Sequence, residues 1–246
     1  MPEPILLKLL RKHWGCPAWV YVEPDRGWLR IAESCPELIE LEDGTCMEVR
    51  DAREFVIARP TGELLESQGS LESLPDGVVT AEMLGPPAIA MIREAFEDVP
   101  YPGDNRLVEG YRDDEVVAIE KQFRRLHNWT AMKNPEFLDG APDGLASALC
   151  FMTPAARHYY LPAYLILDIE GKLGRAEPYF RLTMGFSESG ACGCYEEEFR
   201  AYTPAQARAI IAYLRWMGCD GVSYDETQRA IEVFWLARAE ANTEGA

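Results

Sequence analysis

Cys192 and Cys194 are the side chains whose spacing comes nearest to a metal-binding motif. Two thiolates separated by a single residue can reach the same ion, and Cys219 follows 25 residues after Cys194. A structural zinc site takes four ligands, usually from two such pairs, and the three histidines of the chain are far apart in the sequence. The glycines around the two cysteines therefore favour a turn, and we expect neither a metal nor another cofactor.

His158 is the second candidate for chemistry. It lies in the segment Arg157-His-Tyr-Tyr160, on a predicted helix. A catalytic histidine needs a nucleophile and an orienting acid, and the sequence contains no Gly-x-Ser-x-Gly elbow or comparable pattern. We therefore expect His158 to have a packing or hydrogen-bonding role. An enzyme of unknown chemistry that uses His158, or a thiol or metal site at Cys192 and Cys194, is the alternative.

Three short runs of carboxylates are the remaining candidates. Paired carboxylates can bind a divalent cation or act as acid and base, but the sequence has no Asp-x-Asp-x-Asp-Gly loop. Acidic residues at the start of a helix are also favoured by the helix dipole alone. Such runs can instead bind a basic protein. The candidate partner-binding residues are Glu40, Glu42, Asp43, Asp113, Asp114, Glu115, Glu196, Glu197 and Glu198.

The charge balance narrows the class of partner. The chain of 246 residues carries 41 acidic and 24 basic side chains, a formal net charge of −17. Residues 1–98 contain 19 acidic and 9 basic side chains, and residues 99–246 contain 22 and 15, so both parts are acidic. This balance argues against direct binding of nucleic acid, whose phosphates attract clustered Lys and Arg, and against binding to anionic membranes. It favours a basic protein as partner.

Three features predict a cytoplasmic location. The seven cysteines are an odd number and are scattered, unlike a secreted disulfide framework. The positive charges near the N-terminus follow the first apolar run, whereas in a signal peptide they precede it. The longest apolar stretch, residues 161–169, is far shorter than the roughly 18 residues of a membrane span.

The elements that must position these residues fall into two parts, which together predict an α+β fold. Residues 1–75 are predicted to form a small β-rich module with a short N-terminal helix. Its strand-like segments are separated by turns rich in Pro, Gly and Asp-Gly, a pattern typical of a β-meander or an SH3-like barrel. These segments are residues 18–22, 28–31, 38–41, 46–49 and 54–58. Residues 76–96 are predicted to be a linker and a connecting helix.

Residues 97–241 are predicted to form a mainly α-helical domain, and residues 242–246 a frayed tail. Thr153-Pro154 and Thr203-Pro-Ala-Gln206 are helix start signals, the second with Gln206 at the capping-box position. Pro162 is expected to bend or interrupt the helix that Thr153 opens. The last helix is expected over residues 223–238.

Several motifs of the second part resemble an uncharacterised bacterial domain family. They are Val99-Pro-Tyr-Pro-Gly-Asp104, the stretch Met152–Leu165 with its Leu-Pro-Ala-Tyr-Leu core, and Phe199 followed by Thr203-Pro-Ala-Gln206. The resemblance covers roughly residues 97–236 and leaves the first third outside. It implies no catalytic residues, because the family has no established activity. Its small, acidic members with aromatic helix positions are similar in style to immunity proteins of bacterial toxin systems.

Taken together, these patterns predict a non-enzymatic acidic binding protein of the bacterial cytosol with a basic protein partner. An immunity-type protein that neutralises a toxin is the most specific form of this hypothesis. Besides the enzyme alternative, a nucleic-acid mimic is a second one, because acidic side chains can imitate phosphates and occupy a DNA-binding protein.

Overall fold

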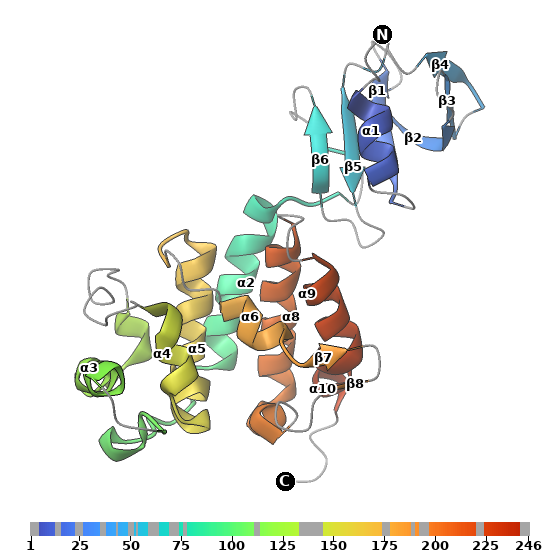
Figure 1. Ribbon diagram of the computed structural model, residues 1–246. Helices are drawn as coiled ribbons and strands as arrows, with labels where there is room; N and C mark the ends of the chain where they lie inside the picture. The colour runs from blue at the N-terminus through green and yellow to red at the C-terminus, as the bar shows by residue number, and fades with distance from the viewer. Residues whose placement is uncertain are drawn as a thin grey trace. The chain divides into compact units, whose positions relative to one another are not determined.

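The computed structural model in Figure 1 describes most of the chain. The described residues are 5–12, 16–22, 27–34, 38–42, 44–48, 52, 54–58, 64–68, 74–75, 78–110, 114–132, 145–173, 178–187, 190–191, 197–219 and 224–241. They form an antiparallel six-stranded sheet followed by a mainly helical region, which confirms the α+β fold class.

The chain divides into two compact units. The first comprises residues 1–83 with residues 219–221, and the second comprises residues 84–218 with residues 222–246. We call them the β unit and the helical unit. No described helix is long and apolar enough to cross a membrane.

The β unit is a sheet with the strand order β4-β3-β2-β1-β5-β6. Four strands follow one another as an antiparallel meander: β1 (Ala18–Val22), β2 (Gly27–Ser34), β3 (Leu38–Leu41) and β4 (Cys46–Glu48). The turn between β3 and β4 contains Gly44 at φ +79°, a conformation that favours glycine, so the Asp-Gly hairpin signal is confirmed. Strand β5 (Phe55–Ala58) then returns to the free edge of β1.

Both faces of β5 are covered. Phe55 and Ile57 pack in a cluster with Leu6 of α1 (Ile5–Lys12), whereas Val56 and Ala58 pack with Val78 in a second cluster. This alternation follows from the period of two of a strand. The short helix predicted near the N-terminus is therefore present, and its Leu6 completes one of the two β-unit cores.

A sixth strand, β6 (Leu64–Gln68), pairs with β5 and lies at the edge of the sheet. The sequence pattern did not predict it, because Glu66, Ser67 and Gln68 show no apolar alternation. An edge strand needs a partner on one side only, so polar residues are tolerated there.

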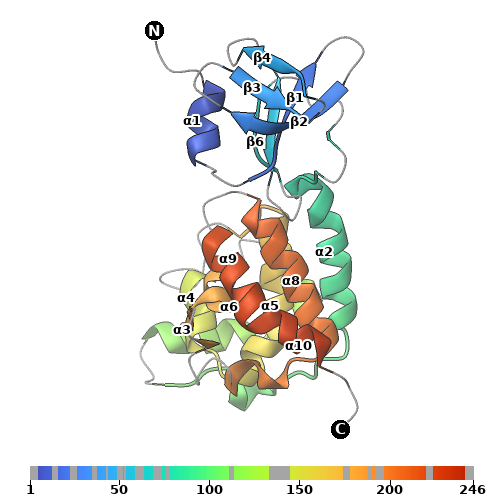
Figure 2. The same ribbon diagram turned by 90° about the vertical axis from the view of Figure 1, so that its right-hand side faces the viewer.

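The helical unit is built around α5 (Pro154–Ile169). Every side chain from Tyr159 to Leu167 is buried. A helix that is apolar on all sides is expected at the centre of a bundle, and α5 contacts α6 (Pro178–Thr183), α8 (Pro204–Gly218) and the 3₁₀ turn η3 (Trp129–Ala131). Figure 2 shows α8 and α9 (Tyr224–Ala230) on one side of this unit with α2 (Ala81–Ala95) alongside.

The predicted helix starts are confirmed. The Thr153 hydroxyl accepts a hydrogen bond from the Ala156 amide at 3.1 Å. At α8, the Thr203 hydroxyl accepts from the Gln206 amide at 3.2 Å and the Gln206 side chain accepts from the Thr203 amide at 3.0 Å, a complete capping box. Pro162, in contrast, does not interrupt α5. We attribute its tolerance to the packing on all sides, which outweighs the lost hydrogen bond.

In the sequence the helical period becomes clear only from Pro87 onward. Helix α2 already begins six residues earlier, at Ala81. Thr80 caps it, because the Met83 amide lies 3.4 Å from the Thr80 hydroxyl. Gly85 is buried in this helix, and a Cβ atom there would lie 3.1 Å from the Ile169 side chain. The glycine therefore permits the close approach of α2 to the end of α5.

The remaining elements of the helical unit are short. They are η2 (Asp104–Arg106), α3 (Asp114–Phe123), α4 (Leu145–Phe151), the hairpin of β7 (Phe186–Ser187) and β8 (Gly190–Ala191), η5 (Phe199–Ala201) and α10 (Leu236–Glu240). Between α9 and α10 the chain forms a π turn, η6 (Ile231–Trp235), in which the Leu236 amide bonds to the Ile231 carbonyl. The predicted last helix is thus present but is not a regular α-helix. The predicted tail, residues 242–246, lies outside the described residues.

Candidate functional site

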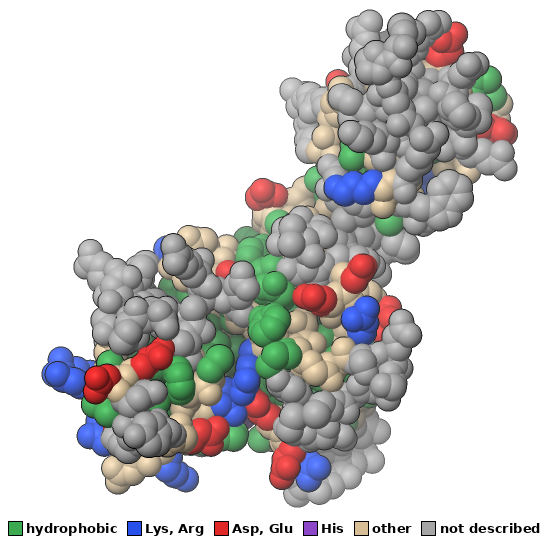
Figure 3. Space-filling view, viewed as in Figure 1, with side chains coloured by type: hydrophobic (Ala, Val, Ile, Leu, Met, Phe, Trp, Pro, Cys, Tyr) green, Lys and Arg blue, Asp and Glu red, His purple; other side chains and the backbone are tan. Residues whose placement is uncertain are grey.

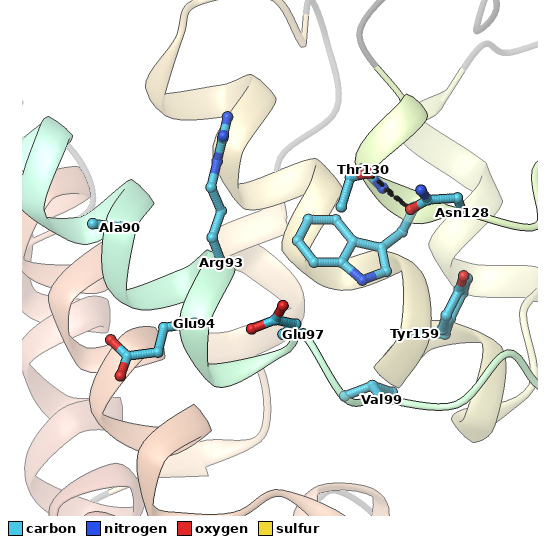
Figure 4. A pocket seen from close by; sticks show the side chains of 9 residues that line it. Ala90, Arg93, Glu94, Glu97, Val99, Asn128, Thr130 and Tyr159 are labelled. Atoms are coloured by element: carbon cyan, nitrogen blue, oxygen red, sulfur yellow. Dashed lines mark hydrogen bonds between the residues drawn. The ribbon is translucent and has the colours of Figure 1, made fainter.

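A recess of about 640 Å³ lies between α2 and the segment Asn128–Thr130. We call it the α2 recess. Its lining residues are Ala90, Arg93, Glu94, Glu97, Val99, Asn128, Trp129, Thr130 and Tyr159. In Figure 4 the Glu97 carboxylate lies between α2 and the segment that carries Asn128 and Thr130, whereas Arg93 and Glu94 point to either side. Glu97 is thus the carboxylate directed into the recess, and Arg93 and Glu94 line its edge (Figure 4).

A second cavity of about 510 Å³ shares Arg93, Trp129 and Thr130 with the α2 recess. We call it the α5 chamber. Its floor is apolar, formed by Met132, Ala163, Ile166 and Leu167, and its rim carries the ion pair between Lys172 and Glu170 at 2.8 Å. The two cavities adjoin at the shared residues, so an elongated ligand can occupy both.

The polar groups of the α2 recess have a fixed orientation. The Asn128 Oδ1 atom accepts from both the amide and the hydroxyl of Thr130, at 2.9 and 2.8 Å, so the Asn128 amide nitrogen points away from Thr130. The Trp129 side chain is 5% exposed, and the part of the chain that the structure describes supplies no acceptor for its indole N–H. These two groups leave hydrogen-bond donors on the recess wall.

The Tyr-Pro-Gly-Asp motif adjoins this wall. The Tyr101 hydroxyl donates to the Asp104 carboxylate at 2.5 Å, and the Tyr101 ring lies 5.4 Å from that of Tyr159. Burial and the Asp104 carboxylate raise the pKa of Tyr101 to about 12, so the phenol stays protonated at neutral pH. Gly103 has φ +90° and ψ 145°, a conformation that is almost restricted to glycine. The motif therefore fixes a turn beside the recess, and its tyrosine is a donor rather than a base.

His158 lies in an aromatic environment and is hydrogen-bonded to the capping box of α8. Its ring is 4.3 Å from that of Tyr202, and its Nε2 atom is 2.9 Å from the Gln206 Oε1 atom. Because that oxygen already accepts from the Thr203 amide, Nε2 carries the proton and donates. Burial lowers the pKa of His158. The structure agrees with the predicted hydrogen-bonding role.

The lowered pKa of His158 predicts a change of stability with pH. Below the unfolded pKa of about 6.5, the unfolded chain binds a proton that folded His158 resists, so stability falls as the pH drops. We expect the variant His158→Gln to lose less unfolding free energy than the unchanged protein between about pH 7.5 and about pH 5.5. Urea unfolding at both pH values measures the difference. His127→Gln, at an exposed histidine, is the control, and an equal loss in the unchanged protein and His158→Gln would contradict the assignment.

Arg157 and Glu198 form a buried ion-pair network. The Arg157 Nε atom donates to one Glu198 oxygen at 2.8 Å, and Arg181 donates to the other at 3.2 Å. The side chains of Arg157 and Glu198 are only 7% and 10% exposed. Arg157 also donates to the Met152 carbonyl and lies 3.4 Å from Glu109. The Glu198 carboxylate is therefore occupied inside the helical unit.

The other predicted partner-binding residues that the structure describes are divided between the β unit and the helical unit. In the β unit, Glu40 and Glu42 are exposed, and Glu42 lies 3.4 Å from Arg30. In the helical unit, Asp114 at the start of α3 and Glu197 are exposed, whereas Glu115 is half-buried. The predicted residues Asp43, Asp113 and Glu196 lie outside the described residues, as do Cys192 and Cys194 of the alternative enzyme site.

Metal binding has no support in the described part of the chain, where no three His, Cys, Asp or Glu side chains lie together in a group that could hold an ion.

The α2 recess was not predicted from the sequence. Its residues come from three segments, 90–99, 128–130 and 159, and none of them forms a motif alone. The sequence offered no signal for it, because residues 101–104, 129 and 159 are far apart in the chain and come together only in the fold.

The fold and the recess define an α+β protein whose helical unit carries an acidic cavity beside a buried tryptophan. The sequence of that unit matches an uncharacterised family, described as a family of unknown function (DUF6714), over residues 87–239. This span is more than half of the chain, so the protein belongs to that family, and the predicted resemblance is confirmed. Nothing is recognised for the N-terminal region. No curated protein and no solved structure matches the chain.

Proposed function

We propose that this protein is a non-enzymatic acidic binding protein of the bacterial cytosol whose partner is a basic protein. The observation that carries the proposal is the α2 recess. Glu94 and Glu97 are exposed at its mouth, and neither has an ion-pair partner among the described residues. Concave sites with a few oriented polar groups are the usual places where proteins bind ligands.

The net charge of −17 supports the choice of a basic partner. A charged surface attracts a partner of the opposite sign and accelerates encounter, and salt weakens this attraction. The exposed carboxylates of Glu40, Glu42, Asp114 and Glu197 add to the field even though they do not line the recess.

Binding is favoured over catalysis because the titratable groups nearest to a catalytic constellation have structural partners. His158 donates to Gln206, and the Tyr101 hydroxyl is held by Asp104. The raised pKa of Tyr101 works against a role as general base. The recess therefore supports binding more directly than either group supports catalysis.

The narrower form of this function is an immunity-type protein that neutralises a toxin. The alternative of a nucleic-acid mimic receives less support, because a mimic needs a continuous acidic tract. On the face shown in Figure 3, acidic and basic side chains of the helical unit are interspersed.

The test is affinity capture with the full chain from the native host at about 0.1 M and about 1 M salt, between which the Debye length falls from about 10 Å to about 3 Å. We expect a basic protein to be retained at the lower salt concentration and released at the higher one, and the purified pair to reproduce this behaviour. If that protein arrests growth when it is expressed alone, coexpression with this chain should restore growth. Recovery of no salt-sensitive partner would contradict the proposed function.

A further inference from the structure

We propose that the α2 recess and the α5 chamber together bind an extended peptide segment of the partner, with an arginine side chain in the recess and a neighbouring apolar side chain in the chamber. This inference rests on the proposed function and specifies its ligand. It is motivated by two independent features of the cavity wall: the carboxylates of Glu94 and Glu97, and the indole N–H of Trp129.

The carboxylates select a cation. Glu97 lies between α2 and the segment that carries Asn128 and Thr130, and Glu94 lines the same recess. A guanidinium group pairs with carboxylates in a planar, bidentate manner. Lysine lacks this planar fork, so the carboxylates favour arginine.

The tryptophan selects a peptide backbone. Trp129 lines the recess, and its indole N–H has no acceptor in the described part of the protein. This N–H can therefore donate to the backbone carbonyl of a bound segment. The Asn128 amide nitrogen offers a second donor on the same wall. Backbone carbonyls beside an arginine are acceptors that both groups can use.

The α5 chamber defines the second side chain. Met132, Ile166 and Leu167 form its apolar floor, and Trp129 lines both this chamber and the acidic recess. An apolar residue next to the arginine can therefore fill it. Arg93, which lines both cavities, disfavours a second cation at this point.

The experiment is a calorimetric titration of the full chain with acetyl-Gly-Arg-Leu-amide and with the same peptide containing citrulline, which is the uncharged analogue of arginine. We expect the arginine peptide to bind with a dissociation constant of about 1 mM and the citrulline peptide to bind at least about tenfold more weakly. The double variant Glu94→Gln, Glu97→Gln should abolish this preference. Trp129→Phe, which keeps a ring and removes the N–H, should weaken both peptides about threefold or more.

The control is the double variant Asp225→Asn, Glu226→Gln, which changes the net charge equally but lies on α9, outside both cavities. It should retain the preference for arginine. Equal binding of the two peptides, no binding at about 10 mM peptide, or equal losses in both double variants would overturn the inference. A captured basic partner that binds the Glu94, Glu97 variant normally would leave the proposed function intact and overturn only this assignment. Peptide binding without any captured partner would support this assignment and contradict the proposed function.

Discussion

Replacing Arg157 with methionine is expected to lower the free energy of unfolding of the helical unit by about 3 kcal/mol. The guanidinium is 7% exposed. Its loss leaves the Glu198 carboxylate, which is 10% exposed, with Arg181 at 3.2 Å as its remaining cation among the described residues. The Met152 carbonyl also loses its arginine donor. A buried charge that keeps only part of its pairing is costly, because neither water nor the missing cation stabilises it.

Chemical denaturation followed by far-ultraviolet circular dichroism measures this loss. Arg125→Met is the matched control, because Arg125 is exposed beyond the end of α3 and its replacement should change stability by less than about 0.5 kcal/mol. Arg157→Lys should lie between the two, since it keeps a charge but cannot reach Glu198 and Met152 with the same fork. The ion-pair network would have no stabilising role if Arg157→Met unfolded at the same denaturant concentration as the control.

Trp235→Ala is expected to cost about 4 kcal/mol, the largest loss among the substitutions considered. Trp235 is fully buried, and its ring centroid lies 4.9 Å from that of Phe199 and 5.0 Å from that of Phe234. Its indole N–H donates to the Leu182 carbonyl at 3.0 Å. Removing the ring therefore leaves a cavity among aromatic side chains and an unpaired buried carbonyl.

Two further variants separate these contributions in the same denaturation experiment. Trp235→Phe keeps most of the ring volume and removes the N–H, so it should cost about 1–2 kcal/mol. Leu236→Ala changes the neighbouring exposed side chain, which is 37% accessible, and should cost less than about 1 kcal/mol. A loss for Trp235→Ala no larger than that for Leu236→Ala would mean that the aromatic cluster does not stabilise the fold.

Local signals in the sequence predicted the fold well where a few neighbouring residues determine it. The Asp-Gly turn before β4, the cap at Thr153 and the capping box of Thr203 and Gln206 all rest on contacts within four residues. Pro162 was misleading because its effect depends on the packing of α5, which involves residues distant in sequence. Strand β6 was missed because an edge position needs no apolar pattern.

The candidate site was less predictable, because its geometry depends on long-range contacts. Three consecutive glutamates indicate an exposed acidic surface, yet Glu198 bonds to Arg157, which precedes it by 41 residues. The α2 recess unites residues of α2 with Trp129 and Tyr159, whose types are ordinary for a helical core. No periodicity within a helix or strand relates these positions, so only the folded chain shows that they share a cavity.

The π turn at Ile231–Trp235 affects how relatives of this protein are to be aligned. A π turn holds one residue more than an α turn, and one residue corresponds to about 100° of rotation around a helix axis. Leu236 bonds to the carbonyl five residues before it, so the chain absorbs the additional residue at this point. In a relative whose last helix is regular, the tryptophan equivalent to Trp235 would stand one position earlier. A gapless alignment would then pair the core residue Trp235 with the wrong position of that relative, whereas a single-residue gap placed at Ile231–Trp235 would restore the match.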